Sequence, residues 1–364
     1  MMLGSFVVTL GLAVYLIVWP VPIEPVAWQA PAAPGYTGPH AANTRLLGVH
    51  HLALNGEVGP EHVIVGADGK LYTGVESGRI VRMGLDGSGQ EVFSNTGGRP
   101  LGMAFDSRGA LIVTDALKGL LSIAPDGKVR VLADSVAGVP MRFPEAVVVA
   151  KNGKIYFTDA STRFSPAQWG STLEAATLDV FEQSATGRVL EYDPATKAVR
   201  VVARGLSFAN GIALGGDENT LFVCESARYR VWKIDVDASQ LDVAERSTHA
   251  VVLFDNLPGY PDNLMRGSDG RIWLGFGGAR NDLDAMAQWP SLRRLALRIP
   301  RFMWKQPKPY GHVMAFTEDG KVVFDLQDPS GNSSLTTGLT ETPDRLYVHN
   351  ANGGSLGWIP RSSP

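Results

Sequence analysis

The sequence predicts an all-β fold, a six-bladed β-propeller with an N-terminal transmembrane helix and helical insertions that act as lids. Three observations lead to this prediction. A short strand motif recurs six times along the chain. Asp-Gly, Asn-Gly and other glycine-rich turns separate the β-type runs, and an uncharged apolar stretch stands at the N-terminus.

The N-terminal stretch carries no charged residue between Leu3 and Pro20. About 18 such residues can just cross a bilayer core of about 30 Å. A cleaved signal peptide is the alternative, but no basic residue precedes the run and no clear small-residue cleavage site follows it. We therefore expect a single-pass anchor at 1–20, an extended linker rich in Pro and Ala at 21–44, and a globular part on the outer, periplasmic or luminal side.

The globular part, residues 45–360, is built around the recurring strand motif. Its copies are 70–74, 110–115, 154–159, 220–225, 271–275 and 345–349. Where nothing is inserted they are about 40 to 45 residues apart, the length of a four-stranded blade. The last copy lacks a fourth strand, and we expect 45–49 to supply it and close the ring, which removes two exposed sheet edges. A pair of β-sandwiches would explain the strands but not the phase of the repeat.

Composition excludes several classes of protein. A formal net charge of −3 gives no global basic field, so we expect no nucleic-acid binding. The single cysteine, Cys224, rules out an intrachain disulfide and a multi-cysteine zinc site. It stands in an apolar run, and we expect it to be a buried small hydrophobe.

Oxygen-bearing side chains recur where the chain enters the innermost strand of a blade. These segments all reach the same face of the disc, around the central channel. The side chains at equivalent positions are Glu61, Glu145, Asn210 and Asp262, with Asn263 beside the last. Each alone is an ordinary turn residue, but four in phase make an all-oxygen set that suits Ca²⁺ better than Zn²⁺ or Mg²⁺.

The same face offers candidates for catalysis. We expect Asp262 to be a ligand and to lie near an attacking water, and His312 and His349 are candidate general bases because both fall on mouth-side ends of strands. A structural or surface role is the alternative for each histidine. Asp115, Asp159 and Glu225 end second strands there, either as hydrogen-bond partners of the site or as solvated acids. No Gly-x-Ser-x-Gly nucleophile elbow, a sharp turn between a strand and a helix, is predicted, so a serine nucleophile has no support.

Two insertions, 161–186 and 278–310, interrupt connections between second and third strands, so we expect both to cover the mouth as lids. Within the second, 289–305 interleaves Leu, Ile, Phe and Trp with basic residues. This pattern is typical of a basic amphipathic helix in a membrane interface, and equally of a lid helix with a solvated basic face.

Several motifs resemble those of strictosidine synthase-like proteins in the SMP-30/gluconolactonase superfamily, including its adipocyte plasma membrane-associated branch. They are 100–102, 155–159, 187–193, 208–211 and 257–263. The resemblance implies calcium ligands at Glu61, Asn210 and Asp262, a further ligand at Asn263, and the opening of lactones and esters at the metal.

Two positions depart from the pattern of these relatives. Glu145 stands where they usually carry Asn, which adds negative charge to the site. Gly338 stands where true strictosidine synthases carry a catalytic glutamate, so we expect no strictosidine synthase activity.

The sequence thus leaves two hypotheses for function. The first is a calcium-dependent hydrolase that acts on small apolar lactones or aryl esters at a membrane surface. The second is a non-catalytic, membrane-anchored propeller whose calcium is structural and whose face binds a partner, because fold resemblance alone does not establish activity.

Overall fold

The computed structural model describes residues 11, 14–304 and 308–361 of the 364-residue chain. Its strands pair into four-stranded antiparallel units that follow one another along the sequence, and we number these blades 1 to 6. Blade 1 contains β2 (Val63–Val65), β3 (Leu71–Gly74), β4 (Arg79–Met83) and β5 (Glu91–Asn95). Blade 2 contains β6 (Pro100–Phe105), β7 (Leu111–Asp115), β8 (Gly119–Ile123) and β9 (Val129–Ala133). Blade 3 contains β12 (Pro144–Val149), β13 (Ile155–Asp159), β14 (Gly187–Asp193) and β15 (Ala198–Leu206).

The remaining blades follow the same plan. Blade 4 contains β16 (Ala209–Leu214), β17 (Thr220–Glu225), β18 (Arg230–Asp235) and β20 (Ala250–Phe254). Blade 5 contains β21 (Gly259–Arg266), β22 (Ile272–Ala279), β23 (Gly311–Phe316) and β24 (Val322–Asp328). Blade 6 contains β25 (Thr336–Glu341), β26 (Arg345–Asn350), β27 (Ser355–Pro360) and β1 (His50–Ala53). A small hairpin, β10 (Ser135–Val136) with β11 (Val139–Pro140), follows blade 2, and β19 (Leu241–Asp242) extends blade 3.

The first strands of the blades contact one another in cyclic order, from β2 through β6, β12, β16, β21 and β25 back to β2. These strands lie inside the ring, and every residue of β16 is buried, as expected for a strand covered on both faces. The outermost strands are more exposed to solvent. Val92 in β5 and Val131 in β9 are each more than half exposed. Burial therefore decreases from the inner strand to the outer strand of a blade.

The N-terminal part of the chain closes the ring through β1, which pairs antiparallel with β27, His50 opposite Trp358. The closing strand therefore begins at His50, and the prediction that 45–49 would supply it was wrong in position. Residues 45–48 form turns instead. The cause is Leu46, which is fully buried in the cluster of Val313 and Leu346 between blades 5 and 6 and so cannot lie on the sheet edge.

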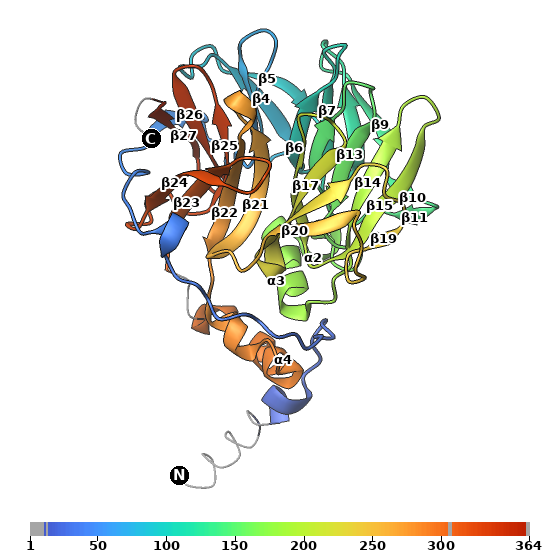
Figure 1. The fold of residues 1–364 in the computed structure, drawn as a ribbon, viewed down its shortest axis with the longest axis vertical. Coiled ribbons are helices and arrows are strands. Elements are labelled where there is room, and N and C mark those ends of the chain that lie inside the picture. Colours follow the sequence, from blue (N-terminus) through green and yellow to red (C-terminus); the bar gives the residue numbers. More distant parts are fainter. Residues whose placement is uncertain (1–10, 12–13, 305–307, 362–364) are drawn as a thin grey trace.

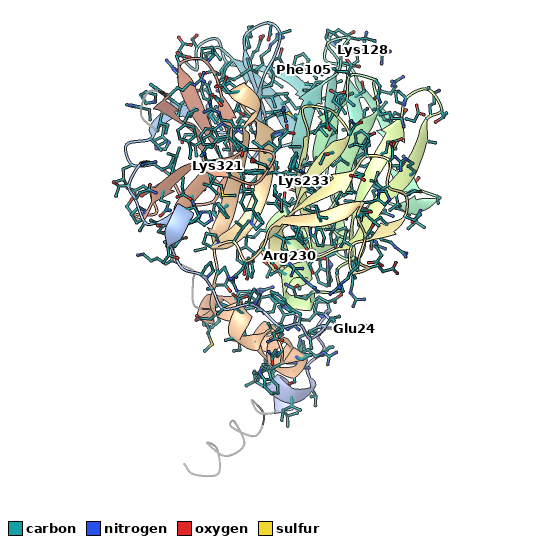
Figure 2. The ribbon with its side chains drawn as sticks, in the orientation of Figure 1. Glu24, Phe105, Lys128, Arg230, Lys233 and Lys321 are labelled. Atoms are coloured by element: carbon teal, nitrogen blue, oxygen red, sulfur yellow. The ribbon has the colours of Figure 1, made fainter. Side chains whose placement is uncertain are left out.

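Two helical insertions occupy the predicted places. The first, between β13 and β14, contains α2 (Pro166–Trp169) and α3 (Thr172–Glu182); the second, between β22 and β23, contains η4 (Asp282–Met286), α4 (Pro290–Arg298) and η5 (Arg301–Met303). Figure 1 shows α3, α4 and the N-terminal segment gathered at one end of the molecule. Glu24 lies toward this end in Figure 2, whereas Phe105 and Lys128 mark the opposite end. Short 3₁₀ turns η1 (Gly38–His40), η2 (Ser226–Arg228) and η3 (Ser268–Gly270) complete the structure.

Residues 20–44, which we call the strap, are extended and packed on this end of the propeller. Ile23 is only 2% exposed and joins the cluster of Leu101, Phe143 and Phe208, which all lie where the chain enters inner strands. The Val26 amide donates to the Glu182 carbonyl at 2.8 Å. The predicted linker thus covers the mouth.

Helix α4 lies against the strap and α3. Its Arg293 is fully buried and donates to the carbonyls of Phe181 and Ala287 at 2.9 and 3.0 Å. Among the described residues, no helix is both long and apolar enough to cross a membrane. Most of the predicted anchor, residues 1–10 and 12–13, lies outside the described residues, as does 305 in the predicted amphipathic segment.

Candidate metal centre

A shared irregularity of the inner strands positions the predicted ligands. In blades 3, 4 and 5 the register between the first and second strands shifts at Glu145, Asn210 and Asp262, each the first of two unpaired residues. Such a bulge adds a residue to one strand and redirects its side chain. A regular strand alternates its side chains between two faces, and the bulge in each of these strands changes the direction of the oxygen-bearing side chain.

Three carboxyl groups and an amide lie near one another on or beside neighbouring inner strands. Glu61 interacts electrostatically with both Glu145 and Asp262, and the Asn210 side chain lies close to Asp262. Burial raises the pKa of Glu145 and of Asp262 well above the usual range, and the charge of Glu61 raises both further. Burial also raises the pKa of Glu61, although the Arg99 guanidinium opposes this. The site therefore concentrates negative charge that lacks a matching set of cations.

Unsatisfied oxygens show that the set fits a cation. Glu145 Oε2, Asn210 Oδ1 and Asp262 Oδ1 are buried and have no hydrogen-bond partner among the described residues. A buried polar atom without a partner costs roughly 1 to 3 kcal/mol, so three such atoms at one point need a compensating ligand. Oxygen donors without sulfur or imidazole match Ca²⁺. Asn263 lies beside them, its Nδ2 donating to the Glu61 carbonyl at 3.4 Å.

Sequence reasoning missed Arg99, which donates from Nη2 to Glu61 Oε2 at 2.9 Å and from Nη1 to the Gly59 carbonyl at 3.1 Å. Its side chain is buried with that of Glu61. Arg99 directly precedes the inner strand of blade 2. It stands two residues before the repeat position that carries Glu145, Asn210 and Asp262 in later blades, so no shared position in the repeat marks it. It neutralises one of the three carboxylates.

The acids that end second strands hold the mouth in place. Asp115 accepts the Arg99 amide at 3.0 Å, and Asp159 accepts the Phe143 amide at 2.8 Å. Glu225 accepts the Ser207 amide at 2.9 Å. All three carboxylates are buried, so they are not solvated loop acids. Each fixes the segment that leads into the inner strand of its own blade.

Threonines in the same motif support the next blade. Thr158 Oγ1 accepts the Ala146 amide at 3.0 Å, which the bulge leaves free, and donates to the Asn210 carbonyl at 2.7 Å. Thr114 donates to the Glu145 carbonyl at 2.6 Å in the same way. The Thr-Asp pair at the end of a second strand therefore positions two successive ligand segments.

His349 reaches the channel wall because Gly338, opposite it in β25, has no side chain. A Cβ atom at Gly338 would stand 2.7 Å from His349 Nδ1 and 3.3 Å from Asn263 Cβ. Thr340 Oγ1 donates to Val63, so it accepts from His349 Nε2 at 2.8 Å, and Nδ1 keeps a buried lone pair without a partner. Burial lowers the pKa of His349 well below its usual value, so the ring is neutral.

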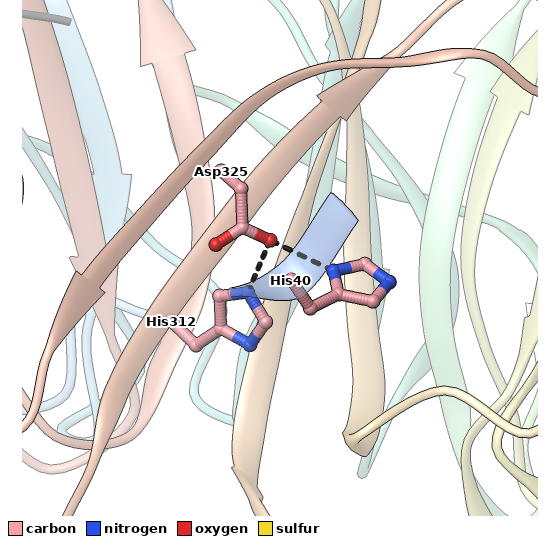
Figure 3. Close-up of side chains that lie close together, drawn as sticks. All are labelled: His40, His312 and Asp325. Atoms are coloured by element: carbon pink, nitrogen blue, oxygen red, sulfur yellow. Dashed lines mark hydrogen bonds and ion pairs between the residues drawn. The ribbon is translucent and has the colours of Figure 1, made fainter. Parts of the chain in front are cut away.

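His312 lies apart from the carboxylate set. Its Nε2 donates to Asp325 Oδ2 at 2.8 Å, and the same oxygen accepts from His40 Nδ1 of the strap at 2.8 Å (Figure 3). Its ring stacks on Phe276 with centroids 4.2 Å apart. The donor atoms of these two histidines and Asp325 lie within 4.8 Å of one another. Because both rings donate to the carboxylate, the cluster acts as a latch that holds the strap to blade 5.

The geometry can be set beside known proteins. Residues 62–281 match the SMP-30/gluconolactonase/LRE-like region, and 38–83 match the N-terminal region of strictosidine synthase-like proteins. The adipocyte plasma membrane-associated protein of Danio rerio is 32% identical over 93% of this chain and 84% of its own length. Strictosidine synthase-like 7 of Arabidopsis thaliana is 36% identical over 70% of this chain, and the match spans 63% of that relative.

Solved structures share the fold at low identity. A gluconolactonase from Xanthomonas campestris superposes with a TM-score of 0.61 at 18% identity, covering 94% of this chain and 99% of its own. A regucalcin from Agrobacterium tumefaciens, described as a calcium-binding protein, gives a TM-score of 0.56 at 14% identity over 85% of this chain and 93% of its own. The chain therefore has the all-β, propeller-type fold of these proteins.

Proposed function

Because the chain belongs to the SMP-30/gluconolactonase family and to its strictosidine synthase-like branch, we propose that it is a calcium-dependent hydrolase of lactones or aryl esters. The six four-stranded units are the blades of one propeller, and Ca²⁺ sits at its mouth. The observation that carries the proposal is the convergence of buried, unpartnered oxygens from Glu145, Asn210 and Asp262.

The residues present divide the work of binding the ion. Glu61, Glu145, Asn210, Asp262 and Asn263 would hold Ca²⁺, which supplies a positive centre that polarises a carbonyl and stabilises its oxyanion. Any proton that the raised pKa keeps on Glu145 or Asp262 would be released on binding, since carboxylates bind calcium in the ionised form. Arg99 holds Glu61 in place through this change.

The chain also offers groups that can activate water. Asp262 Oδ2 points toward the space that Gly277 leaves open, since a Cβ atom there would lie 2.6 Å from it. Asp262 is thus placed to orient an attacking water, and His349 Nδ1 is a neutral acceptor beside Asn263 that can take its proton. His312 is the poorer base in this arrangement, because its contacts are with Asp325, Phe276 and the strap.

A membrane surface fits the lid end of the molecule. Phe302 and Met303 beside α4 are 87% and 64% exposed. Ile17 and Val18 of the N-terminal segment are exposed to a similar extent. Arg298 joins the two segments by donating to the Trp19 carbonyl at 2.6 Å. We propose that residues 1–20 anchor the chain, that 289–305 lies in the interface, and that the globular part is on the outer side, with small apolar lactones or esters as substrates.

The test uses the purified full-length chain in detergent, with a panel of alkyl lactones and aryl esters, in calcium or in EGTA. We expect turnover that EGTA abolishes and that Asp262→Ala lowers by at least about 100-fold, roughly 3 kcal/mol of transition-state stabilisation. His349→Gln should lower kcat by about 100-fold or more, and the matched control His312→Gln should change it little. Equal losses in the two histidine variants would exclude His349 as the specific base.

One observation favours a second function. Ile23 of the strap is buried against Leu101 and Phe143, where the chain enters inner strands, and a closed channel of this kind suits a calcium-stabilised binding module. In that case calcium would raise the melting temperature, Asp262→Ala would remove the rise, and none of the esters or lactones would be hydrolysed.

A further inference from the structure

A second group of metal-ligating side chains lies where the strap meets blade 5, outside the oxygen set at the mouth (Figure 3). It consists of His40 at the end of η1, His312 in β23 and Asp325 in β24. One ring nitrogen of each histidine and one oxygen of the carboxylate lie within 4.8 Å of one another. Residues far apart in the sequence thus direct three donor atoms to one place.

The surroundings fix the direction of two of these three side chains. The His312 ring stacks on Phe276 with centroids 4.2 Å apart and an angle of only 11° between the ring planes. Asp325 Oδ1 accepts from Asn43 Nδ2 at 3.3 Å and also from Gln327 Nε2, whereas Oδ2 faces the two imidazoles. Hydrogen bonds that orient a ligating carboxylate in this way are typical of metal sites in proteins.

The spacing of the donor atoms is close to that of a metal site. Both histidine nitrogens lie 2.8 Å from Asp325 Oδ2. Ligand atoms at about 2.0 to 2.1 Å from a tetrahedral zinc ion are roughly 3.3 Å apart, so each ring would recede from the carboxylate by about half an ångström. His40 can make this shift because it ends a short 3₁₀ turn and is not part of a sheet.

The ring protons do not prevent coordination. A neutral imidazole carries one proton, which either nitrogen can hold. His312 Nδ1 is buried and has no hydrogen-bond partner among the described residues, so no bond is lost there when the proton leaves Nε2. Within the described part of the chain Asp325 forms ion pairs with the two histidines and with no Lys or Arg, so its negative charge is available to a cation.

We propose that His40, His312 and Asp325 bind a zinc ion, with water as the fourth ligand. Two neutral imidazoles and one carboxylate suit Zn²⁺, whereas Ca²⁺ and Mg²⁺ prefer oxygen ligands throughout. The side chain of His40 is 12% exposed and those of Asp325 and His312 less, so the ion enters from the side of the strap. Zinc fastens the strap to blade 5 more firmly than the hydrogen bonds alone. Hydrolysis at the mouth does not require it.

The experiment titrates the full-length protein with Zn²⁺ by isothermal calorimetry in saturating calcium, and we expect one zinc ion to bind per chain. Mg²⁺ in place of Zn²⁺ should show no binding. His40→Gln keeps a group that can donate to Asp325 but removes the imidazole, so it should weaken zinc binding at least about tenfold. His249→Gln is the matched control, because His249 Nδ1 also lies 2.8 Å from a carboxylate oxygen, that of Asp235, in an exposed pair. It should leave the affinity unchanged.

Hydrogen exchange provides a second measurement on the same samples. Zinc should slow the exchange of amides in residues 38–44 of the natural chain and of His249→Gln, but not of His40→Gln. Asp325→Asn should lose zinc binding as well, and His40→Gln alone decides if that variant does not fold. Absence of zinc binding at micromolar concentrations, unchanged affinity in His40→Gln, or zinc binding that leaves exchange in the strap unchanged would each overturn the proposal.

Discussion

Buried acids at the residue scale have two distinct roles in this protein. The carboxylates of Asp115, Asp159 and Glu225 each accept a hydrogen bond from a backbone amide. They therefore stabilise the loops that contain those amides. Asp179 in α3 is different, because burial raises its pKa to about 7, with Glu182 adding to the rise and Ser161 opposing it. Folding therefore favours the protonated form of Asp179.

Asp179→Asn should accordingly change how stability depends on pH. A raised native pKa contributes stability below the unfolded value of about 3.9 and loses it as pH rises toward about 7. The variant keeps a neutral side chain, so at pH 8 we expect it to be more stable than the natural chain by on the order of 2–4 kcal/mol, and at pH 4 nearly equal. Urea unfolding at both pH values measures this. Asp237→Asn, at an exposed aspartate, is the control, and a pH-independent difference would contradict the role of Asp179.

At the element scale, the inner strands combine two requirements that conflict in a regular sheet. They must pair with the second strand, and they must also turn oxygen-bearing side chains toward the channel. A bulge resolves the conflict but frees an amide, and Thr158 takes up that amide while bonding to the carbonyl of Asn210 in the next blade. The ligand geometry of one blade thus depends on a hydroxyl from its neighbour.

Thr158→Val removes this hydroxyl with almost no change in volume. Two buried backbone groups lose their partner, so we expect a loss of about 1–3 kcal/mol in stability and a weaker rise in melting temperature on adding calcium. Thr177→Val, at an exposed threonine of α3, should leave the calcium effect unchanged. Thermal melts with calcium and with EGTA decide the matter, and an equal calcium effect in the Thr158 variant would disprove the coupling.

The repeat allowed the fold to be predicted from the sequence. Strands with an apolar middle, some of them ending in Thr-Asp, recur at the spacing of a four-stranded blade. The equivalent positions of Glu145, Asn210 and Asp262 in the repeat could also be predicted, whereas their binding of a metal stays a prediction. The role of Arg99 could not be predicted, since it depends on a contact between blades. His349 could be named as a candidate, but its setting opposite Gly338 could not, since it depends on the register of β25 with β26. The burial of Leu46 could not be predicted from the sequence either. Leu46 lies in a turn and is buried because its side chain fills the space between two blades.

At the scale of the whole molecule, the N-terminal segment serves two regions of the propeller. The strand β1 closes blade 6, and the strap covers the mouth and is latched by His40 to Asp325. These functions are separable along the chain, because the strap ends before His50. Loss of the strap should expose the mouth, whereas loss of β1 should open the ring.

Two truncations test this division. A chain that starts at Arg45 should fold cooperatively and bind calcium, with a lower melting temperature because the apolar contacts of Ile23 are lost. A chain that starts at Glu57 lacks β1 and leaves β27 as an unpaired edge, so we expect aggregation or loss of the cooperative transition. Differential scanning calorimetry compares them with the full chain, and a cooperative transition in the shorter one would show that closure is dispensable.

The strap also sets the orientation of whatever the N-terminus is attached to. Ile23, which is buried, is only four positions after Trp19, which is at most about 14 Å of extended chain. A surface joined ahead of Trp19 is therefore kept facing the mouth and cannot swing to the far end of the disc. Molecules that reach the mouth would have to pass through the narrow space between the protein and that surface. The short segment between Trp19 and Ile23 would therefore limit the size of the molecules that can enter.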